Sequence, residues 1–236
     1  MIPLPIHYTE IEDIYTRTLG SGVSTLAVAA AEDGEGVSTL SYALARRAAA
    51  MGHKTLLVDF NRRMPSVGQR LGIATCEWSP GNPSAQSKII TLSRTGLSVL
   101  PASRGGIENL NARETSTLSA CFQQWKEQFD FVIADTSPLT IQNQENYPPE
   151  NVCAACEGTI LVVLTGRTSE TRVLEACNKL RSSNVNVLGA VLNDRHAPAL
   201  ADELIRETRR LDGTIPRVME KLRDIIHNST FINQSI

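Results

Sequence analysis

The sequence contains no long hydrophobic run, few aromatic residues and almost no net charge, and these absences exclude several classes of protein. Its apolar stretches are of strand length, well short of the roughly 18 residues that a membrane-spanning helix needs. A net charge of -2 gives no indication of nucleic acid as a partner. The first twenty residues include Glu10, Glu12 and Asp13 but no basic segment, unlike a signal peptide. We therefore expect a soluble cytoplasmic protein with no transmembrane segment and no nucleic-acid partner.

Cysteine is also scarce, with five residues in a chain of 236. An odd number, in a chain long enough to build a large core, favours reduced thiols over a disulfide framework. Cys153 and Cys156 form a C-x-x-C pair, but no second pair or nearby histidine completes a zinc site. The sequence favours buried or half-buried free cysteines over a metal or redox role.

Short apolar runs alternate with helix-forming stretches through most of the chain. Runs without polar alternation are typical of strands buried on both faces of a parallel sheet. The pattern predicts a doubly wound α/β fold, with a mostly parallel sheet and helices on both faces. Residues 76–88 and 137–150 are rich in Pro, Asn, Ser and Gln and are predicted to be surface loops. We expect strands at residues 25–31, 53–60, 97–102, 130–135, 158–165 and 185–194, and helices at residues 38–51, 117–129 and 169–183.

No repeat, low-complexity tract or linker divides the chain, so residues 1–236 are expected to form one domain. Residues 1–24 are its predicted N-terminal helical segment, and residues 195–236 its predicted C-terminal helices. Within the latter, residues 215–226 place apolar side chains on one helical face, opposite a face of mixed charge. A membrane anchor would favour an excess of positive charge there, so packing against the domain or a partner is the preferred interpretation.

The stretch AEDGEGVSTL, from Ala31 to Leu40, resembles a phosphate-binding loop that has lost its lysine. The pattern G-x-x-x-x-G-K-[ST] places lysine after the final glycine, where this chain has Val37. The stretch follows a predicted strand and opens a predicted helix, so backbone N–H groups would point at an anion. Gly34 and Gly36 permit the close backbone approach, and Ser38 stands where a Mg²⁺-binding hydroxyl would be. An ordinary β-to-α turn is the alternative explanation of the glycines.

Two aspartates end later strands. Asp59 closes the predicted strand at residues 53–60, and Asp135 closes the strand at residues 130–135, the Walker B position. The carboxyl ends of parallel strands are where ligands bind in open α/β sheets. Either aspartate could instead cap a turn, but the two together with the loop favour a Mg²⁺-nucleotide site.

The chain resembles the bacterial tyrosine kinase (BY-kinase) domains of polysaccharide export in the segments LLVDFNRRMPSVGQRLG, LSVLPAS, FDFVIADTSPL, GTILVVLTGRTSE and NVLGAVLND. Those domains belong to the MinD/ParA group of deviant Walker P-loop ATPases. The resemblance covers residues 25–194 and is most specific at residues 59–65, where basic residues and a proline follow an acidic residue. It implies a P-loop NTPase fold over the single domain, with Mg²⁺ and catalytic-water positions at Ser38, Asp59 and Asp135. It also implies nucleotide contacts from Gly34, Glu35, Gly36, Val37, Ser38, Thr39 and Asn193, the last near the adenine.

The resemblance further implies a cellular setting. BY-kinase domains work beside membrane-spanning chain-length regulators in capsule and exopolysaccharide assembly. The expected partner is therefore the cytoplasmic face of a membrane polysaccharide copolymerase, with this chain peripheral at the inner membrane. A homodimer is a further expectation.

The chain departs from the family at the lysine positions of the phosphate-binding loop. Val37 replaces the loop lysine, and Glu32 stands where many relatives place a signature lysine. Lysine acts as a point charge on the β- and γ-phosphates, whereas the carboxylates of Glu32, Asp33 and Glu35 would repel them. Basic residues near the second strand, Arg62 and Arg63, are interpreted as surface or partner contacts.

The features of an active kinase are missing as well. The family's autokinases end in a tyrosine cluster, whereas this chain ends in HNSTFINQSI. The ring-forming E-x-x-R-x-x-R motif keeps only its glutamate, at residues 10–16. We therefore expect a degenerate, non-catalytic partner or regulator, a pseudokinase in which Asp59 and Asp135 are vestigial catalytic residues.

Three alternatives stay open at this point. The chain could bind ATP or ADP weakly with Mg²⁺. It could be an active Mg-ATPase whose non-standard loop is completed by a partner. It could also be a MinD/ParA-like positioning factor that binds membrane or protein.

Overall fold

The computed structural model describes residue 4, residues 7–104, 110–141 and 146–195, and residues 208 and 220–222. It contains two compact units, Met1–Asn193 and Asp194–Ile236. All the elements named below belong to the first unit. The predicted C-terminal helices, including the amphipathic stretch at residues 215–226, lie almost entirely outside the described residues. One domain over residues 1–236 stays a prediction.

Strands and helices alternate along the first unit. Its strands are β1 (Thr25–Ala30), β2 (Thr55–Asp59), β3 (Ile90–Thr91), β4 (Ser98–Leu100), β5 (Phe131–Asp135), β6 (Gly158–Leu164) and β7 (Val187–Asn193). Its helices are α1 (Thr9–Arg17), α2 (Val37–Ala50), α3 (Val67–Leu71), α4 (Ser84–Ser87), α5 (Thr115–Lys126), α6 (Pro149–Ala155) and α7 (Glu170–Ser182), with short 3-10 helices η1 (Leu19–Ser21) and η2 (Leu110–Arg113).

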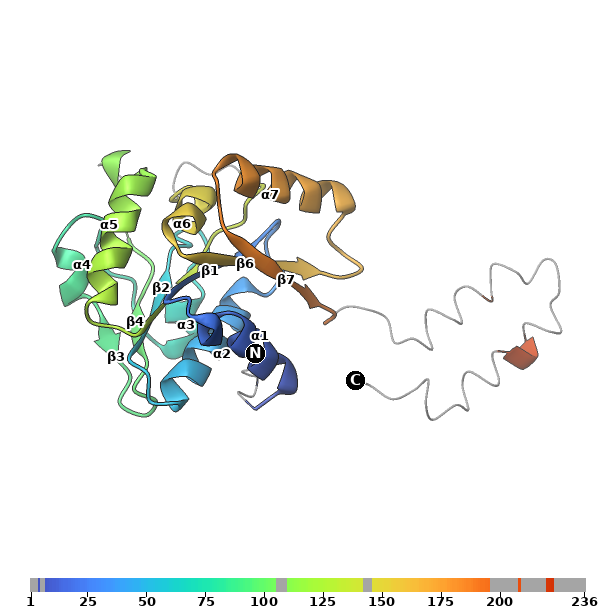
Figure 1. Cartoon of the computed structure of the whole chain (residues 1–236), viewed down its shortest axis with the longest axis horizontal. Helices are drawn as coiled ribbons and strands as arrows, with labels where there is room; N and C mark the ends of the chain where they lie inside the picture. The colour runs from blue at the N-terminus through green and yellow to red at the C-terminus, as the bar shows by residue number, and fades with distance from the viewer. Residues whose placement is uncertain are drawn as a thin grey trace. The chain divides into compact units, whose positions relative to one another are not determined.

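The strands form one sheet in the order β3-β4-β2-β5-β1-β6-β7. Neighbouring strands are parallel except for the edge pair of β3 and β4. Figure 1 shows α5, α6 and α7 on one side of the sheet, and α1 and α2 on the other. Each group of helices covers its own hydrophobic cluster. The predicted doubly wound α/β fold is confirmed.

The central strands are apolar throughout because both of their faces are covered. Every residue of β1 and of β2 is buried, which explains the absence of polar alternation in the sequence. Ser169 is the N-cap of α7, since its hydroxyl accepts a hydrogen bond from the backbone N–H of Arg172. All five cysteines are free and buried or half-buried, as predicted.

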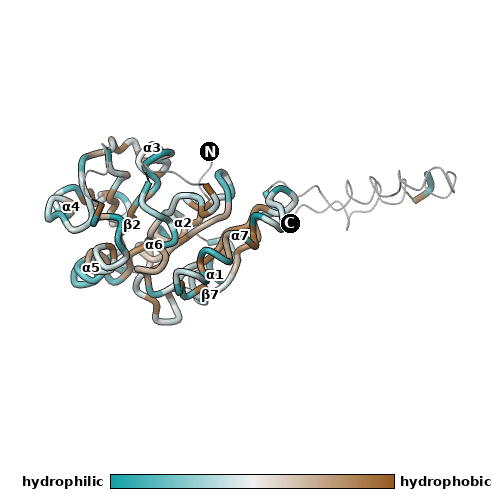
Figure 2. Tube along the Cα trace, turned by 90° about the horizontal axis from the view of Figure 1, so that it is seen from above, coloured by the Kyte–Doolittle hydropathy of each residue, from teal (hydrophilic) through white to brown (hydrophobic). Residues whose placement is uncertain are grey.

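The two segments predicted to be surface loops contribute large side chains to the core, so that prediction was wrong in part. Trp78 is 5% exposed and Tyr147 is 2% exposed. Their rings stack with centroids 6.3 Å apart, and both pack edge-on against Phe60. The indole N–H of Trp78 donates to the carbonyl oxygen of Pro101 at 2.7 Å. Figure 2 shows the tube around α4 as mostly hydrophilic. A single buried aromatic side chain therefore anchors each of these polar segments to the core.

No helix in the described ranges is both long and apolar enough to cross a membrane.

Replacement of the indole in this aromatic cluster should destabilise the fold. Trp78→Ala should lower the free energy of unfolding by about 3–5 kcal/mol, because it removes a buried ring and leaves a cavity. Urea unfolding followed by circular dichroism measures the change. The control is Tyr8→Ala, since Tyr8 is 51% exposed. A loss below about 1 kcal/mol for Trp78→Ala would show that residues 76–88 do not belong to the core.

Candidate functional site

The loop between β1 and α2 brings the start of α2 to the carboxyl edge of the sheet. Gly34 and Gly36 have φ angles of 82° and 108°, in the left-handed region that glycine adopts without strain. Gly36 is the N-cap of α2, and no side chain among the described residues caps the helix. The first backbone N–H groups of α2 can therefore face an anion.

A close contact also disfavours a side chain at position 36. A Cβ atom at this position would lie 2.7 Å from Nδ2 of Asn193, at the end of β7. The same amide group donates to the carbonyl oxygen of Glu35 at 2.8 Å. Asn193 therefore holds the loop from beside it, and its predicted position near an adenine stays a prediction.

Parallel pairing places the two predicted aspartates next to each other. Asp59 and Asp135 are register partners across β2 and β5, and Asp135 is also the register partner of Val28 in β1. Neither carboxylate is exposed. The β1–α2 loop and both aspartates thus share one edge of the sheet, as the sequence predicted.

The two carboxylates differ in their hydrogen bonds. Asp59 accepts from the backbone N–H of Asn61 at 3.0 Å and from that of Val67 at 3.3 Å, so it also fixes the start of α3. Both carboxylate oxygens of Asp135 are buried without a hydrogen-bond partner in the described part of the chain. An uncompensated carboxylate in such a place is costly.

Burial raises the pKa of both carboxyl groups. For Asp59 the negative charge of Asp135 adds to the rise in pKa, while its backbone hydrogen bonds oppose it. For Asp135 the Ser38 hydroxyl and the charge of Arg70 oppose the rise in pKa, but burial dominates. The pair therefore holds a proton more readily than ordinary aspartates do, or accepts a cation in its place.

The residues present fit Mg²⁺. This ion takes oxygen ligands and uses one or two protein carboxylates together with substrate phosphates and water. Asp135 supplies unpartnered oxygens, and the Ser38 hydroxyl and Asp59 lie beside it. The described residues contain no group of three or more His, Cys, Asp or Glu that could hold a metal by itself. An ion here would need phosphate oxygens or water to complete its shell.

Two of the three loop carboxylates are paired with arginines. Glu32 lies 3.3 Å from Nε of Arg172 in α7, and Asp33 pairs with Arg63, which follows β2. Arg63, interpreted from the sequence as a surface or partner contact, therefore contacts the loop. Both pairs are partly exposed, so they neutralise charge without adding much stability.

The third loop carboxylate, that of Glu35, lies inside the protein. Glu35 is 2% exposed, and its carboxylate accepts hydrogen bonds from the backbone N–H of Ala31 at 3.2 Å and from the Thr168 hydroxyl. Burial raises the pKa of Glu35, against the effect of these hydrogen bonds. The acidic side chain therefore points toward the base of the loop, and its repulsion of a phosphate is smaller than the sequence suggested.

Val37 occupies the position of the missing lysine with a packed apolar side chain. It is half-buried and packs against the hydrophobic cluster beneath α2. The side chain of Thr39, two residues later, accepts a hydrogen bond from the guanidinium of Arg70 at 2.7 Å. Arg70 was not identified from the sequence, because α3 is only five residues long and shows no clear period.

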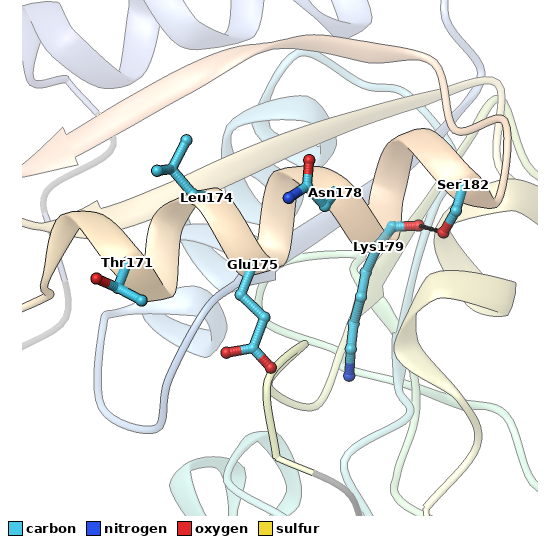
Figure 3. A pocket seen from close by; sticks show the side chains of 6 residues that line it. All are labelled: Thr171, Leu174, Glu175, Asn178, Lys179 and Ser182. Atoms are coloured by element: carbon cyan, nitrogen blue, oxygen red, sulfur yellow. Dashed lines mark hydrogen bonds between the residues drawn. The ribbon is translucent and has the colours of Figure 1, made fainter.

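The structure also contains a shallow depression along the outer side of α7. Figure 3 shows that its lining side chains all come from this one helix: Thr171, Leu174, Glu175, Asn178, Lys179 and Ser182. The Lys179 ammonium is already used, since it donates to the carbonyl oxygen of Leu139 at 2.7 Å. None of the predicted site residues lines this depression, so the carboxyl edge of the sheet is the better candidate.

Relatives in sequence agree with the family resemblance. The tyrosine-protein kinase CpsD of Streptococcus agalactiae is 27% identical over 175 residues, which cover 71% of this chain and 74% of CpsD. The succinoglycan biosynthesis transport protein ExoP of Rhizobium meliloti (strain 1021) is 28% identical over 182 residues, covering 74% of this chain and 22% of ExoP. No model of a known protein family matches the chain.

Solved structures agree with the fold. The chimerical protein CapA2B2 superposes with a TM-score of 0.66 at 21% identity, covering 78% of this chain and 82% of that one. The septum site-determining protein MinD of Pyrococcus horikoshii OT3, solved with Mg-ADP, superposes with a TM-score of 0.59 at 19% identity, covering 74% and 71%. The resemblance to the BY-kinase and MinD-like P-loop group is confirmed.

The stability of the protein should fall as the pH rises, because of the buried aspartates. Burial raises the pKa of Asp135 to about 7 and that of Asp59 in the same direction. Between about pH 4 and pH 7 the folded chain then binds more protons than the unfolded chain. The free energy of unfolding should decrease across this range, by up to about 1.4 kcal/mol per pH unit for each group.

Urea unfolding at several pH values tests this slope. Asp135→Asn should flatten the pH dependence and raise the stability above pH 7, whereas the exposed-site control Asp13→Asn should change neither. Mg²⁺ should reduce the loss at high pH in the wild type and in Asp13→Asn, but not in Asp135→Asn. Parallel slopes for the wild type and Asp135→Asn would contradict the assignment.

A side chain at Gly36 should destabilise the loop twice over, through backbone strain and through the contact with Asn193. Gly36→Ala should cost about 1–3 kcal/mol of unfolding free energy. Gly22→Ala is the matched control, because Gly22 has a similar φ of 101° but no described atom within 4 Å of its added Cβ. Equal losses in the two variants would show that the contact with Asn193 carries no weight.

Proposed function

We propose that this chain, a relative of the BY-kinases and MinD-like P-loop ATPases, binds a Mg²⁺-nucleotide without efficient turnover and serves as a non-catalytic partner in polysaccharide assembly. One observation carries this proposal. Gly34, Gly36, Ser38 and Asp135 lie where a phosphate site would need them, while half-buried Val37, packed against the core, stands where the motif has its lysine.

Each part of the site has a physical role in binding. The backbone N–H groups at the start of α2 would receive the phosphate oxygens. Ser38 and Asp135 would hold the Mg²⁺, with Asp59 beside them, and the ion would neutralise part of the phosphate charge. Bound Mg²⁺ would also compensate the unpartnered oxygens of Asp135.

Turnover is disfavoured by the same loop. Loss of one preorganised donor to a developing charge costs about 10²–10³ in rate. An apolar side chain at position 37 cannot replace that donor. The chain would thus bind a nucleotide without hydrolysing it efficiently.

The proposed setting is the cytoplasmic face of a membrane polysaccharide copolymerase, with the chain peripheral at the inner membrane. ExoP, named for succinoglycan biosynthesis and transport, carries a segment similar to this chain within a longer protein. That arrangement supports a role beside a polysaccharide transport component. A homodimer is part of the same proposal.

A working Mg-ATPase completed by a partner is the second candidate. The pairing of Glu32 and Asp33 with Arg172 and Arg63 favours it, because two of the loop charges that would repel phosphate are neutralised. If the chain is an ATPase, its ATP hydrolysis should depend on Asp135. The first candidate predicts no ATP hydrolysis.

Calorimetric titration with Mg-ATP, together with phosphate-release measurements, tests the proposal. The wild type should bind weakly and show no turnover above the protein-free blank. Val37→Lys should bind about tenfold more tightly or better, because it restores a charge-assisted contact worth about 1.5–3 kcal/mol.

Val37→Met is the matched control, because it lengthens the side chain without adding charge. Micromolar affinity with turnover in the wild type would contradict the non-catalytic role. Abolition of that turnover by Asp135→Ala would then support the second candidate.

A further inference from the structure

The β1–α2 loop is held at one residue, Glu35, by the ends of three neighbouring strands. β1, β6 and β7 lie side by side in the sheet. Ala31 directly follows β1, Thr168 lies between β6 and α7, and Asn193 ends β7. The first two donate hydrogen bonds to the Glu35 carboxylate, and the amide of Asn193 donates to the Glu35 carbonyl oxygen at 2.8 Å. Glu35 therefore joins the loop to the half of the sheet that lies away from Asp59.

The hydrogen bonds of Glu35 are shielded from water, unlike the ion pairs of the other two loop carboxylates. Glu35 is buried, whereas the pairs of Glu32 and Asp33 are partly exposed. A buried carboxylate is costly unless it is hydrogen-bonded, so the loop conformation that satisfies it is favoured over others. In that conformation the carboxylate reaches back four residues to the backbone N–H of Ala31 and closes the loop on itself. Glu35 thus constrains the loop more strongly than Glu32 or Asp33 does.

The direction of this side chain decides its effect on a phosphate. Gly36 and Val37, where α2 begins, directly follow Glu35. The orientation of the first N–H groups of α2 therefore depends on how Glu35 is held. A carboxylate that faced the anion would repel it, but this one is turned toward Thr168. Loss of its hydrogen bonds should then weaken phosphate binding, whereas removal of a repelling carboxylate would strengthen it.

We infer that Glu35 is a positioning residue of the site, whose carboxylate, held by Ala31 and Thr168, keeps the loop in the conformation that receives phosphate. This inference rests on the proposed function and concerns the same site. The family resemblance implied a nucleotide contact at Glu35, whereas the role inferred for its side chain is indirect, through the loop backbone. Thr168 extends this role to the segment before α7, which takes part in shaping the site.

Calorimetry on the full chain with Mg-ATP and with Mg-tripolyphosphate separates the reach of the carboxylate from its charge. Glu35→Asp keeps the charge but shortens the side chain by one methylene group. It should weaken the binding of both probes by about tenfold, because a loop that is competent for a tenth of the time binds with a tenth of the affinity. Glu35→Gln should bind within about threefold of the wild type, because its carbonyl oxygen can accept from Ala31 and its amide can donate to the Thr168 hydroxyl.

Thr168 offers a second test that leaves Glu35 in place. Thr168→Val keeps the shape of the side chain but removes the hydroxyl, and it should weaken both probes as Glu35→Asp does. Thr168→Ser keeps the hydroxyl and should bind like the wild type. The matched control is Thr171→Val, at an exposed position of α7, which should also bind like the wild type. All titrations are made well below the melting temperature of each variant, so that a general loss of stability does not appear as a loss of affinity.

The outcomes separate this inference from the proposed function. Wild-type affinity in Glu35→Asp, with tighter binding by Glu35→Gln, would show that the carboxylate acts as a repelling charge and would overturn the positioning role alone. Wild-type affinity in Thr168→Val would overturn it as well, since the loop would not depend on that hydrogen bond. Absence of Mg-ATP binding by the wild type would overturn the proposed function and this inference together.

Discussion

The parallel pairing of β5 with both β1 and β2 is the constraint on which the site depends. It aligns Asp135 with Asp59 and places both beside the β1–α2 loop. Since these strands are covered on both faces, water does not solvate the carboxylates, and burial raises the pKa of each. Two buried carboxyl groups in register favour a bound proton or a cation, and both follow from the sheet topology.

The second constraint is the charge of the loop. Its three carboxylates are each engaged by a different part of the fold: α7, the segment after β2, and Thr168 before α7. These contacts join the loop to segments that lie far away in the sequence. They support the conformation of the loop.

The positions of the long strands along the chain, the fold class and the two aspartates were predictable, because continuous apolar runs and the residues that end them are local features. The elements missed were short, from two to seven residues: β3, α3, α4, η2 and α6. Such lengths show no clear period. The burial of Trp78 and Tyr147 was missed for a related reason, since each is one aromatic residue in a polar segment and its environment comes from Phe60.

The sequence by itself determined the α/β class and the place of the loop after the first strand. It also determined that Val37 stands where the phosphate-loop motif has lysine. Each of these depends on residue type and local spacing. Only the tertiary structure showed that Glu32 and Asp33 pair with arginines. It also showed that the Asp135 carboxylate has no hydrogen-bond partner among the described residues. Ion pairs and hydrogen bonds such as those of Asp33 with Arg63 and of Thr39 with Arg70 join separate segments. Their geometry follows from how the sheet brings those segments together, and no local pattern encodes it.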